Sequence, residues 1–200
     1  MTRLLSLQGG MAAGKTTAIR WLAIHEPRVY VLEEDIACPS AEVRRRNLDK
    51  HRFEDYIEIQ RLFIRHEIAR WQAAQAFPYS VIDLGAGEIE FYTLHYPASI
   101  GQDWPVEAAL APELAALRRC RADRTLFLDA SPAVLRARKE ADLTRDRSFF
   151  EHTLTRLLPA KRRWFAAQPG TEFLTTDTLT AEQLCEAVHH WVERCLAQPK

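Results

Sequence analysis

A glycine-rich segment near the amino terminus constrains the fold of this chain more than any other feature of its sequence. Residues 9–16 are GGMAAGKT and match the pattern Gly-x4-Gly-Lys-Ser/Thr. A short apolar run, Leu4–Gln8, precedes the segment, and a helical pattern, Lys15–His25, follows it. Glycines let the backbone curl so that successive N–H groups point at one anion, and the helix start adds its positive dipole end. The segment therefore predicts a phosphate-binding loop between a strand and a helix.

The loop motif predicts a ligand and gives roles to two of its side chains. Lys15 is expected to carry positive charge to the β- and γ-phosphates, and the Thr16 hydroxyl is expected to ligate magnesium. ATP with Mg²⁺ is therefore the predicted cofactor. The alternative without a bound ligand is a glycine-rich turn that only precedes the first turn of a helix. The residues predicted to bind the nucleotide are Gly9, Gly10, Met11, Ala12, Ala13, Gly14, Lys15, Thr16 and Thr17.

Apolar runs and helical patterns alternate along the rest of the chain. Four further strands are predicted at 29–32, 80–84, 125–129 and 172–175. Helices are predicted at 53–75, 105–121, 149–167 and 180–197, with a charged helix or helical loop at 40–50. Residues 88–103 are expected to be mixed because Pro97 and Gly101 interrupt them. Strands without polar alternation, separated by helices, indicate one α/β domain over residues 1–200, with a parallel sheet covered on both faces.

The charge balance and the hydropathy exclude several classes of protein. Lys+Arg and Asp+Glu number 27 each, so no net field attracts nucleic acid, and nucleic-acid binding is not expected. No apolar run approaches the length of a membrane span, and no Cys or His pattern has zinc-ligand spacing. We expect a cytoplasmic protein with free thiols, possible homodimer formation and a small-molecule partner.

Acidic residues follow two of the predicted strands. Glu33-Glu34-Asp35 comes directly after the second strand, and Asp83 lies at the end of the third. Ligands of an open parallel sheet bind outside the carboxyl ends of its strands. Asp83 is therefore predicted to hold magnesium through water and to line the substrate site, although a turn-capping Asp is the alternative. Among the trio, Glu34 and Asp35 are the candidates to accept a proton from an attacking hydroxyl, and a solvated acidic turn is the alternative.

A cluster of basic residues lies between the fourth strand and the helix predicted at 149–167. It contains Arg138, Arg145 and Arg147. Guanidinium groups that close over a transferred phosphoryl group stabilise its transition-state charge, so these three are predicted to be catalytic. The alternative is a solvated, charged helix end with ion pairs inside the helix.

With the loop, the acidic residues and the arginines placed, the chain resembles P-loop small-molecule kinases of the nucleoside and nucleotide kinase group. Deoxynucleoside kinases and thymidylate-kinase-like proteins are the relatives that it resembles. GGMAAGKTT matches the phosphate loop, and Gln60 in YIEIQRLFIRHE resembles the glutamine that recognises the base in deoxynucleoside kinases. The segment TRDRSFFEHTLTRLLPAKRRWF resembles the lid and the helix behind it, and TTDT at 175–178 resembles the loop beside adenine.

The resemblance implies a three-layer P-loop NTPase fold with strand order 2-3-1-4-5, a helical lid at about 139–150 and ATP as donor. It implies a phosphotransferase acting on a nucleoside or nucleotide, with Gln60 at the substrate. DLGAG at 83–87 instead resembles the glycine-rich acceptor element of shikimate kinases, so another small metabolite stays open as acceptor. An ATP-binding NTPase switch module is a further alternative. Gln60 has its own alternative, a solvated polar residue on an amphipathic helix.

Overall fold

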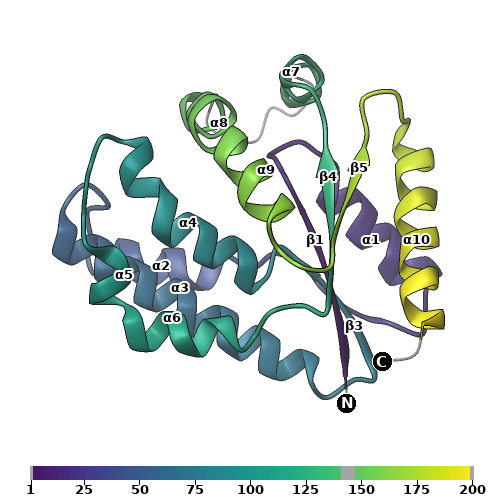
Figure 1. The fold of residues 1–200 in the computed structure, drawn as a ribbon, viewed down its shortest axis with the longest axis horizontal. Coiled ribbons are helices and arrows are strands. Elements are labelled where there is room, and N and C mark those ends of the chain that lie inside the picture. The colour runs from purple at the N-terminus through teal and green to yellow at the C-terminus, as the bar shows by residue number, and fades with distance from the viewer. Residues whose placement is uncertain (1, 141–146, 199–200) are drawn as a thin grey trace.

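Five parallel strands form the middle layer of the molecule (Figure 1). The structure is a computed structural model that describes residues 2–140 and 147–198. For residues 147 and 148 it describes the backbone alone. The strands are β1 (Arg3–Gly9), β2 (Tyr30–Leu32), β3 (Tyr79–Asp83), β4 (Arg124–Asp129) and β5 (Thr171–Thr175). Their order is β2-β3-β1-β4-β5, which confirms the predicted fold class and strand order.

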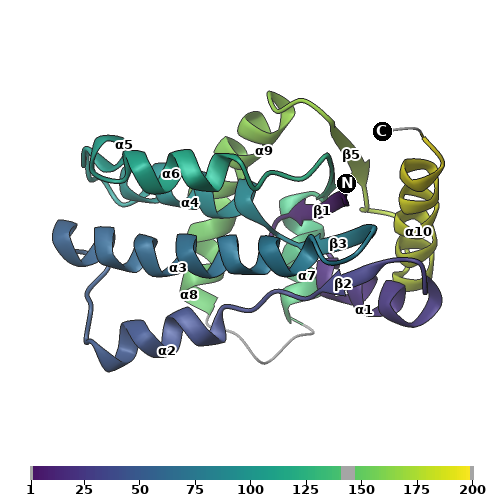
Figure 2. The same ribbon diagram turned by 90° about the horizontal axis from the view of Figure 1, so that it is seen from below.

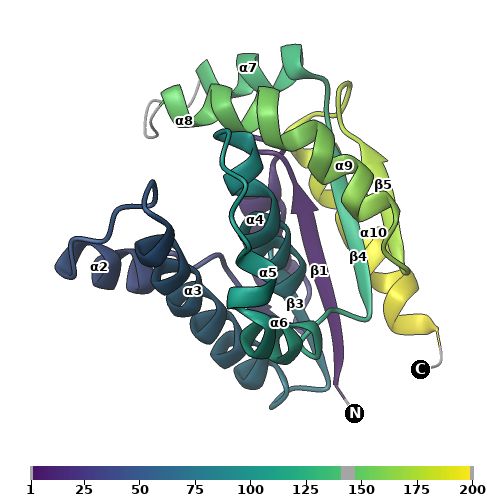
Figure 3. The ribbon, with the colours of Figure 1, turned by 60° about the vertical axis from the view of Figure 1, so that its left-hand side comes forward.

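Helices cover both faces of the sheet (Figures 1 and 3). One face carries α1 (Lys15–His25) and α10 (Ala181–Ala197), which contact each other. The other face carries α3 (Phe53–Ala74), α4 (Ala86–Ser99) and α9 (Leu158–Ala166). The remaining helical segments are α2 (Ala37–Arg45), α5 (Val106–Ala109), α6 (Ala111–Arg118), α7 (Pro132–Glu140), α8 (Arg147–His152) and a π-helical turn, η1 (Thr153–Leu157). Among the described residues, no helix combines the length and apolarity that crossing a membrane requires.

The central strand β1 presents a different kind of side chain to each face. Leu5 and Leu7 are fully buried in the apolar core that α1 and α10 close, where Trp191 of α10 also lies. Ser6 and Gln8 alternate with them and point to the opposite face. One face of the strand therefore builds the core, and the other supplies buried polar groups that contact the turn after β3.

The segment predicted to be mixed, residues 88–103, is helical over most of its length, so that prediction was wrong. Helix α4 continues through Pro97 up to Ser99. A proline inside a helix leaves the carbonyl four residues before it without its donor. Here that carbonyl belongs to Thr93, and the hydroxyl of Tyr56 on α3 donates to it at 3.0 Å. A tertiary contact thus replaces the missing hydrogen bond.

The aromatic residues of α4 pack into a second apolar cluster rather than lining an open pocket. Phe91 and Tyr96 are buried there together with Tyr56 of α3. The helix predicted at 105–121 is divided into α5 and α6, because Pro112 cannot donate to the carbonyl four residues earlier. These helices and the start of α3 form the arm that extends from the sheet in Figure 2.

Candidate functional site

The loop between β1 and α1 has the backbone geometry that its glycines predict. Gly9 has φ 141°, and a Cβ there would lie 2.5 Å from the carbonyl oxygen of Leu128 on β4. Gly14 is left-handed at φ 97° and precedes α1 without a side-chain cap, so the first N–H groups of the helix are not capped by a side chain. The Lys15 ammonium donates to the Gly10 carbonyl at 2.9 Å. Curled backbone, helix start and lysine therefore converge on one anion-binding concavity.

Asp83 lies beside this loop as a buried carboxylate without donors. It ends β3, pairs in register with Leu7 of β1 and is 1% exposed. Neither carboxylate oxygen has a hydrogen-bond partner among the described residues. Burial raises the pKa of Asp83 to about 6, and the positive charge of Lys15 opposes that shift. An orphaned carboxylate here fits a cation, so Asp83 and the Thr16 hydroxyl are the residues that could hold Mg²⁺.

Two members of the acidic trio after β2 are engaged away from the loop. Glu33 is exposed and forms an ion pair with Arg20 of α1 at 3.0 Å. Asp35 accepts from the backbone N–H of Ala37 at 3.1 Å, at the start of α2. Its other carboxylate oxygen lies 3.3 Å from Nε2 of His66. Both side chains therefore have local structural partners.

Glu34 differs from its neighbours in where its charge acts. It is half-buried, and its negative charge raises the pKa of the Asp83 carboxyl. The same charge favours the protonated form of Lys161, a buried lysine of α9. The charge of Glu34 thus acts on Asp83 and Lys161, whereas Glu33 and Asp35 have other partners.

An arginine that the sequence analysis did not single out joins the ends of β2 and β3. The Arg70 guanidinium on α3 donates to the carbonyl oxygens of Glu33 at 2.8 Å and Asp83 at 3.2 Å. It also forms an ion pair with Glu67 at 2.6 Å, and burial raises the pKa of that carboxyl. An Arg and a Glu three residues apart are common on helix surfaces, so the sequence gives little sign of this clamp.

We expect Arg70→Met to destabilise the protein by about 3 kcal/mol, because it leaves the buried Glu67 carboxylate unpaired and two strand-end carbonyls without a donor. Arg65→Met, on an exposed position of the same helix, is the matched control and should change the free energy of unfolding by less than about 0.5 kcal/mol. Urea unfolding of both variants measures the difference. Equal stabilities would rule out the clamp.

The turn after Asp83 is held from below by the polar side chains of β1. Leu84 has φ 69° and Gly85 has φ 97°. The Leu84 carbonyl accepts from the Ser6 hydroxyl and from the Gln8 side-chain amide. Two buried donors thus fix a backbone conformation that a leucine rarely adopts.

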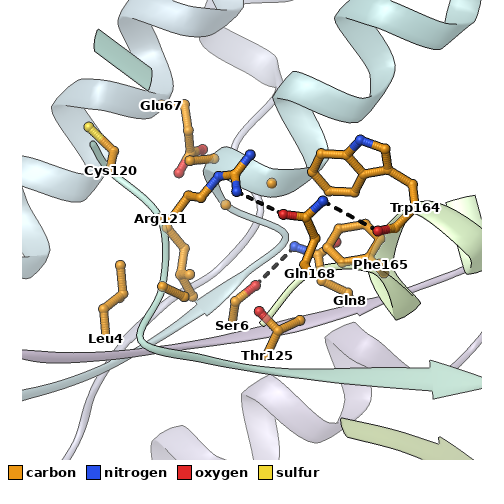
Figure 4. Close-up of a pocket in the computed structure, with 15 residues that line it drawn as sticks. Leu4, Ser6, Gln8, Glu67, Cys120, Arg121, Thr125, Trp164, Phe165 and Gln168 are labelled. Carbon is orange, nitrogen blue, oxygen red and sulfur yellow. Dashed lines mark hydrogen bonds between the residues drawn. The ribbon is translucent and has the colours of Figure 1, made fainter. Parts of the chain in front are cut away.

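A small cavity of about 40 Å³ lies under this turn, between the sheet and α9. Figure 4 shows its walls, where Arg121 donates to Gln168 at 2.7 Å. Its polar lining includes Ser6, Gln8 and Glu67. This volume holds a few water molecules at most, so the cavity supports the turn and does not accommodate a nucleoside.

Lys161 of α9 is the second basic residue at the loop, and it was not predicted. Its ammonium donates to the Gly9 carbonyl at 2.8 Å and lies 2.5 Å from the carboxylate of Glu88 on α4. Burial lowers the pKa of Lys161, and the charge of Glu88 opposes that change. In the sequence, this lysine stands in a run with Arg162 and Arg163 that is typical of a solvated helix face.

The predicted lid arginines are only partly described. Arg138 of α7 donates to the Thr176 hydroxyl at 3.0 Å and to the Thr176 carbonyl at 2.6 Å, so its guanidinium lies on the TTDT loop after β5. Arg145 lies outside the described residues. Arg147 begins α8, and its side chain lies outside the description as well.

Gln60 is buried in α3, so the alternative of a solvated surface residue was wrong. It is 6% exposed, and its side-chain carbonyl accepts from the Thr93 hydroxyl at 2.8 Å. The contact fixes the orientation of the amide between α3 and α4. Its role toward a substrate stays a prediction.

Strand, curled loop, helix and strand-end carboxylate together define a P-loop nucleoside-triphosphate-binding protein. Comparison of the sequence with models of protein families identifies the family of this chain. The chain matches the AAA domain family over residues 5–160 and belongs to it. The match spans the loop, the first four strands and the start of α9. Comparison with curated proteins found no significant match.

Solved structures share the fold at low sequence identity. Thymidylate kinase from Candida albicans superposes with a TM-score of 0.64 at 14% identity, over 96% of this chain and 92% of that one. Deoxyadenosine kinase from M. mycoides with dCMP and dCDP gives 0.70 at 11% identity, over 96% and 99% of the two chains. Its complex with dATP gives 0.69 at 11% identity, over 95% and 99%. The fold is that of nucleoside and nucleotide kinases.

Proposed function

We propose that this protein is an ATP-dependent phosphotransferase that transfers the γ-phosphoryl group to a small molecule, a nucleoside or a nucleotide. The observation that carries the proposal is the buried, donor-free carboxylate of Asp83, which ends the strand next to β1 and whose pKa responds to the charges of Lys15 and Glu34. The full-length likeness to kinases that bind deoxynucleotides supports the choice of acceptor class.

The residues divide the reaction into donor and acceptor roles. The loop N–H groups and Lys15 bind and orient the triphosphate, with Thr16 and Asp83 placed to hold Mg²⁺ directly or through water. Bound Mg²⁺ neutralises charge on the phosphate oxygens. The acceptor oxygen forms a bond to the γ-phosphorus as the bond to the β,γ-bridging oxygen breaks, and ADP leaves. Glu34 accepts the proton of the acceptor hydroxyl. Arg138, Arg145 and Arg147 remain the candidates to stabilise the transferred group.

The test is transfer of label from γ-labelled ATP, with magnesium, to panels of nucleosides, nucleotides and other small metabolites. The proposal expects label on one chemical class of acceptor, and expects that acceptor to raise the melting temperature further when a non-hydrolysable ATP analogue is present. Hydrolysis of ATP at the same rate in every panel would contradict it and would favour the nucleotide-switch alternative. Label on a non-nucleoside metabolite would retain the phosphotransferase and change the acceptor class.

We expect Glu34→Gln to lower kcat by roughly 10²–10⁴-fold, because glutamine cannot accept the acceptor proton. Glu33→Gln is the matched control. Its side chain pairs with Arg20 on the surface, so kcat should change by less than about two-fold. Steady-state transfer assays on both variants, with the acceptor that the panels identify, measure the contrast. Equal kcat values for the two variants would remove Glu34 from the base role.

A further inference from the structure

Lys161 is a buried ammonium whose two described partners belong to different parts of the site. The side chain is 7% exposed. One partner is the carbonyl of Gly9, the first residue of the phosphate loop, and the other is the carboxylate of Glu88 in the first turn of α4. Lysine is almost never fully buried unless its charge is paired. The position therefore indicates a specific use of this charge.

The helix that carries Lys161 lies directly against the loop. A Cβ on Gly10 would meet both methyl groups of Leu158, at 3.4 and 3.5 Å. Leu158 and Lys161 are three residues apart and share one face of α9. The apolar side chain thus covers the second loop residue, while the ammonium holds the first. Leu158 therefore lies within van der Waals reach of Gly10.

The hydrogen bond to Gly9 constrains more than one atom. The peptide bond between Gly9 and Gly10 is planar and trans, so its C=O and N–H point in opposite directions. A donor that holds the Gly9 C=O, here the Lys161 ammonium, therefore also fixes the direction of the Gly10 N–H. Backbone N–H groups are what a glycine-rich loop offers to phosphate, and the Gly10 N–H belongs to this loop. Gly9 itself, at φ 141°, has unusual backbone freedom without such an anchor.

We propose that Lys161 is a positioning residue of the phosphate loop, which holds the Gly9–Gly10 peptide in its binding orientation and is itself held in place by Glu88. The proposal rests on the proposed function, because it takes the loop to be the triphosphate site. Through its two partners, Lys161 joins the phosphate loop to α4, the helix that begins directly after the turn at residues 84 and 85. A purely structural ion pair is the competing explanation, and variants can separate the two.

The experiment measures the affinity of the full chain for the Mg²⁺ complex of a non-hydrolysable ATP analogue by calorimetry, together with melting temperatures. Lys161→Met keeps the length of the side chain and removes its donors. We expect it to weaken affinity by at least about ten-fold, the loss that one charge-assisted hydrogen bond produces. Arg163→Met removes one charge from an exposed position of the same helix and should bind within about two-fold of the unaltered protein.

The double variant Lys161→Met with Glu88→Gln removes the carboxylate that the single variant leaves without its cation. Replacing both members of a buried pair is often neutral for stability. We therefore expect the double variant to recover the melting temperature while its nucleotide affinity stays weak. Recovery of both quantities would overturn the positioning role, as would unchanged affinity in a folded Lys161→Met protein. Failure of the unaltered protein to bind any magnesium–nucleotide would instead overturn the proposed function.

Discussion

Replacing Lys15 by alanine should reduce phosphoryl transfer by roughly 10²–10³-fold or more, because the variant loses the cation that faces the β- and γ-phosphates. The Lys15 ammonium now donates to the Gly10 carbonyl at 2.9 Å, within the loop. It is also the described charge that most opposes the raised pKa of Asp83. Its removal therefore weakens both the donor site and the ionised form of the carboxylate. Measured kcat/KM for ATP, at saturating acceptor, gives the size of the loss.

The fold should survive this change. Lys15 is half-buried at the first position of α1, and alanine is a good helix former. Arg20→Ala, on the exposed side of the same helix, is the matched control, since its partner is Glu33 at the surface. Transfer by Lys15→Ala at the rate of the Arg20→Ala control would refute the donor assignment. Circular dichroism on both variants excludes unfolding as the cause of a loss.

The second large effect is expected at Asp83, where activity and stability should change in opposite directions. Asp83→Asn removes the negative charge that we propose holds the cation, so we expect transfer to fall by at least about 10²-fold and the magnesium requirement to rise. The same change should stabilise the protein when no ligand is bound. A carboxylate without hydrogen-bond donors, 1% exposed, destabilises the folded state once it ionises.

The pH dependence of this stabilisation follows from the pKa of Asp83, which is about 6 in the folded protein against an ordinary value of 3.8 for an aspartate. A raised carboxyl pKa means that the folded state binds the proton more tightly than the unfolded state. The favourable contribution is complete below about pH 3.8 and is lost as the pH rises through about 6. Asp83→Asn should therefore be more stable than the unaltered protein by about 1–3 kcal/mol at about pH 7.5, and by little near pH 4.

Urea unfolding at the two pH values, without nucleotide or divalent cation, measures this difference. A stability gain of the same size at both pH values would show that burial of the charge is not its cause. Wild-type transfer activity in the Asp83→Asn variant would show that the carboxylate does not serve the cation. The two measurements are independent, so each tests one part of the interpretation.

The sequence predicted the parts of this site that depend on local pattern. The loop, the strand before it and the helix after it lie within the first 25 residues, and each has its own signal in spacing and hydropathy. Asp83 was also predicted, because a parallel sheet brings the carboxyl ends of its strands to one edge. What local pattern could not decide was which of three adjacent acids faces the loop. That choice depends on Arg20 and His66, which come from other helices.

The residues that the sequence did not reveal all act through long-range contacts. Lys161 reaches Gly9 across 152 positions of the chain, and nothing in its charged neighbourhood distinguishes it from a solvated lysine. Arg70 reaches Asp83 from the last part of the long helix α3. Pro97 was expected to interrupt a mixed segment, but helix α4 continues through it, and the Tyr56 hydroxyl of a different helix takes the carbonyl that the proline leaves free. Tertiary structure decided each of these cases.

The position of β1 in the middle of the sheet has a consequence for folding during synthesis on the ribosome. This strand emerges first, but the Leu84 carbonyl that Ser6 contacts lies 78 residues later, and the Asp123 carboxylate that the Leu4 amide contacts lies 119 residues later. At a synthesis rate of about 5–20 residues per second, the nascent strand waits on the order of ten seconds for both neighbours. Throughout that interval β1 lacks both of the strands that flank it in the sheet, and the loop that follows it is incomplete. β1 therefore precedes both of its partners along the chain and can complete its pairing only after β4 has been made.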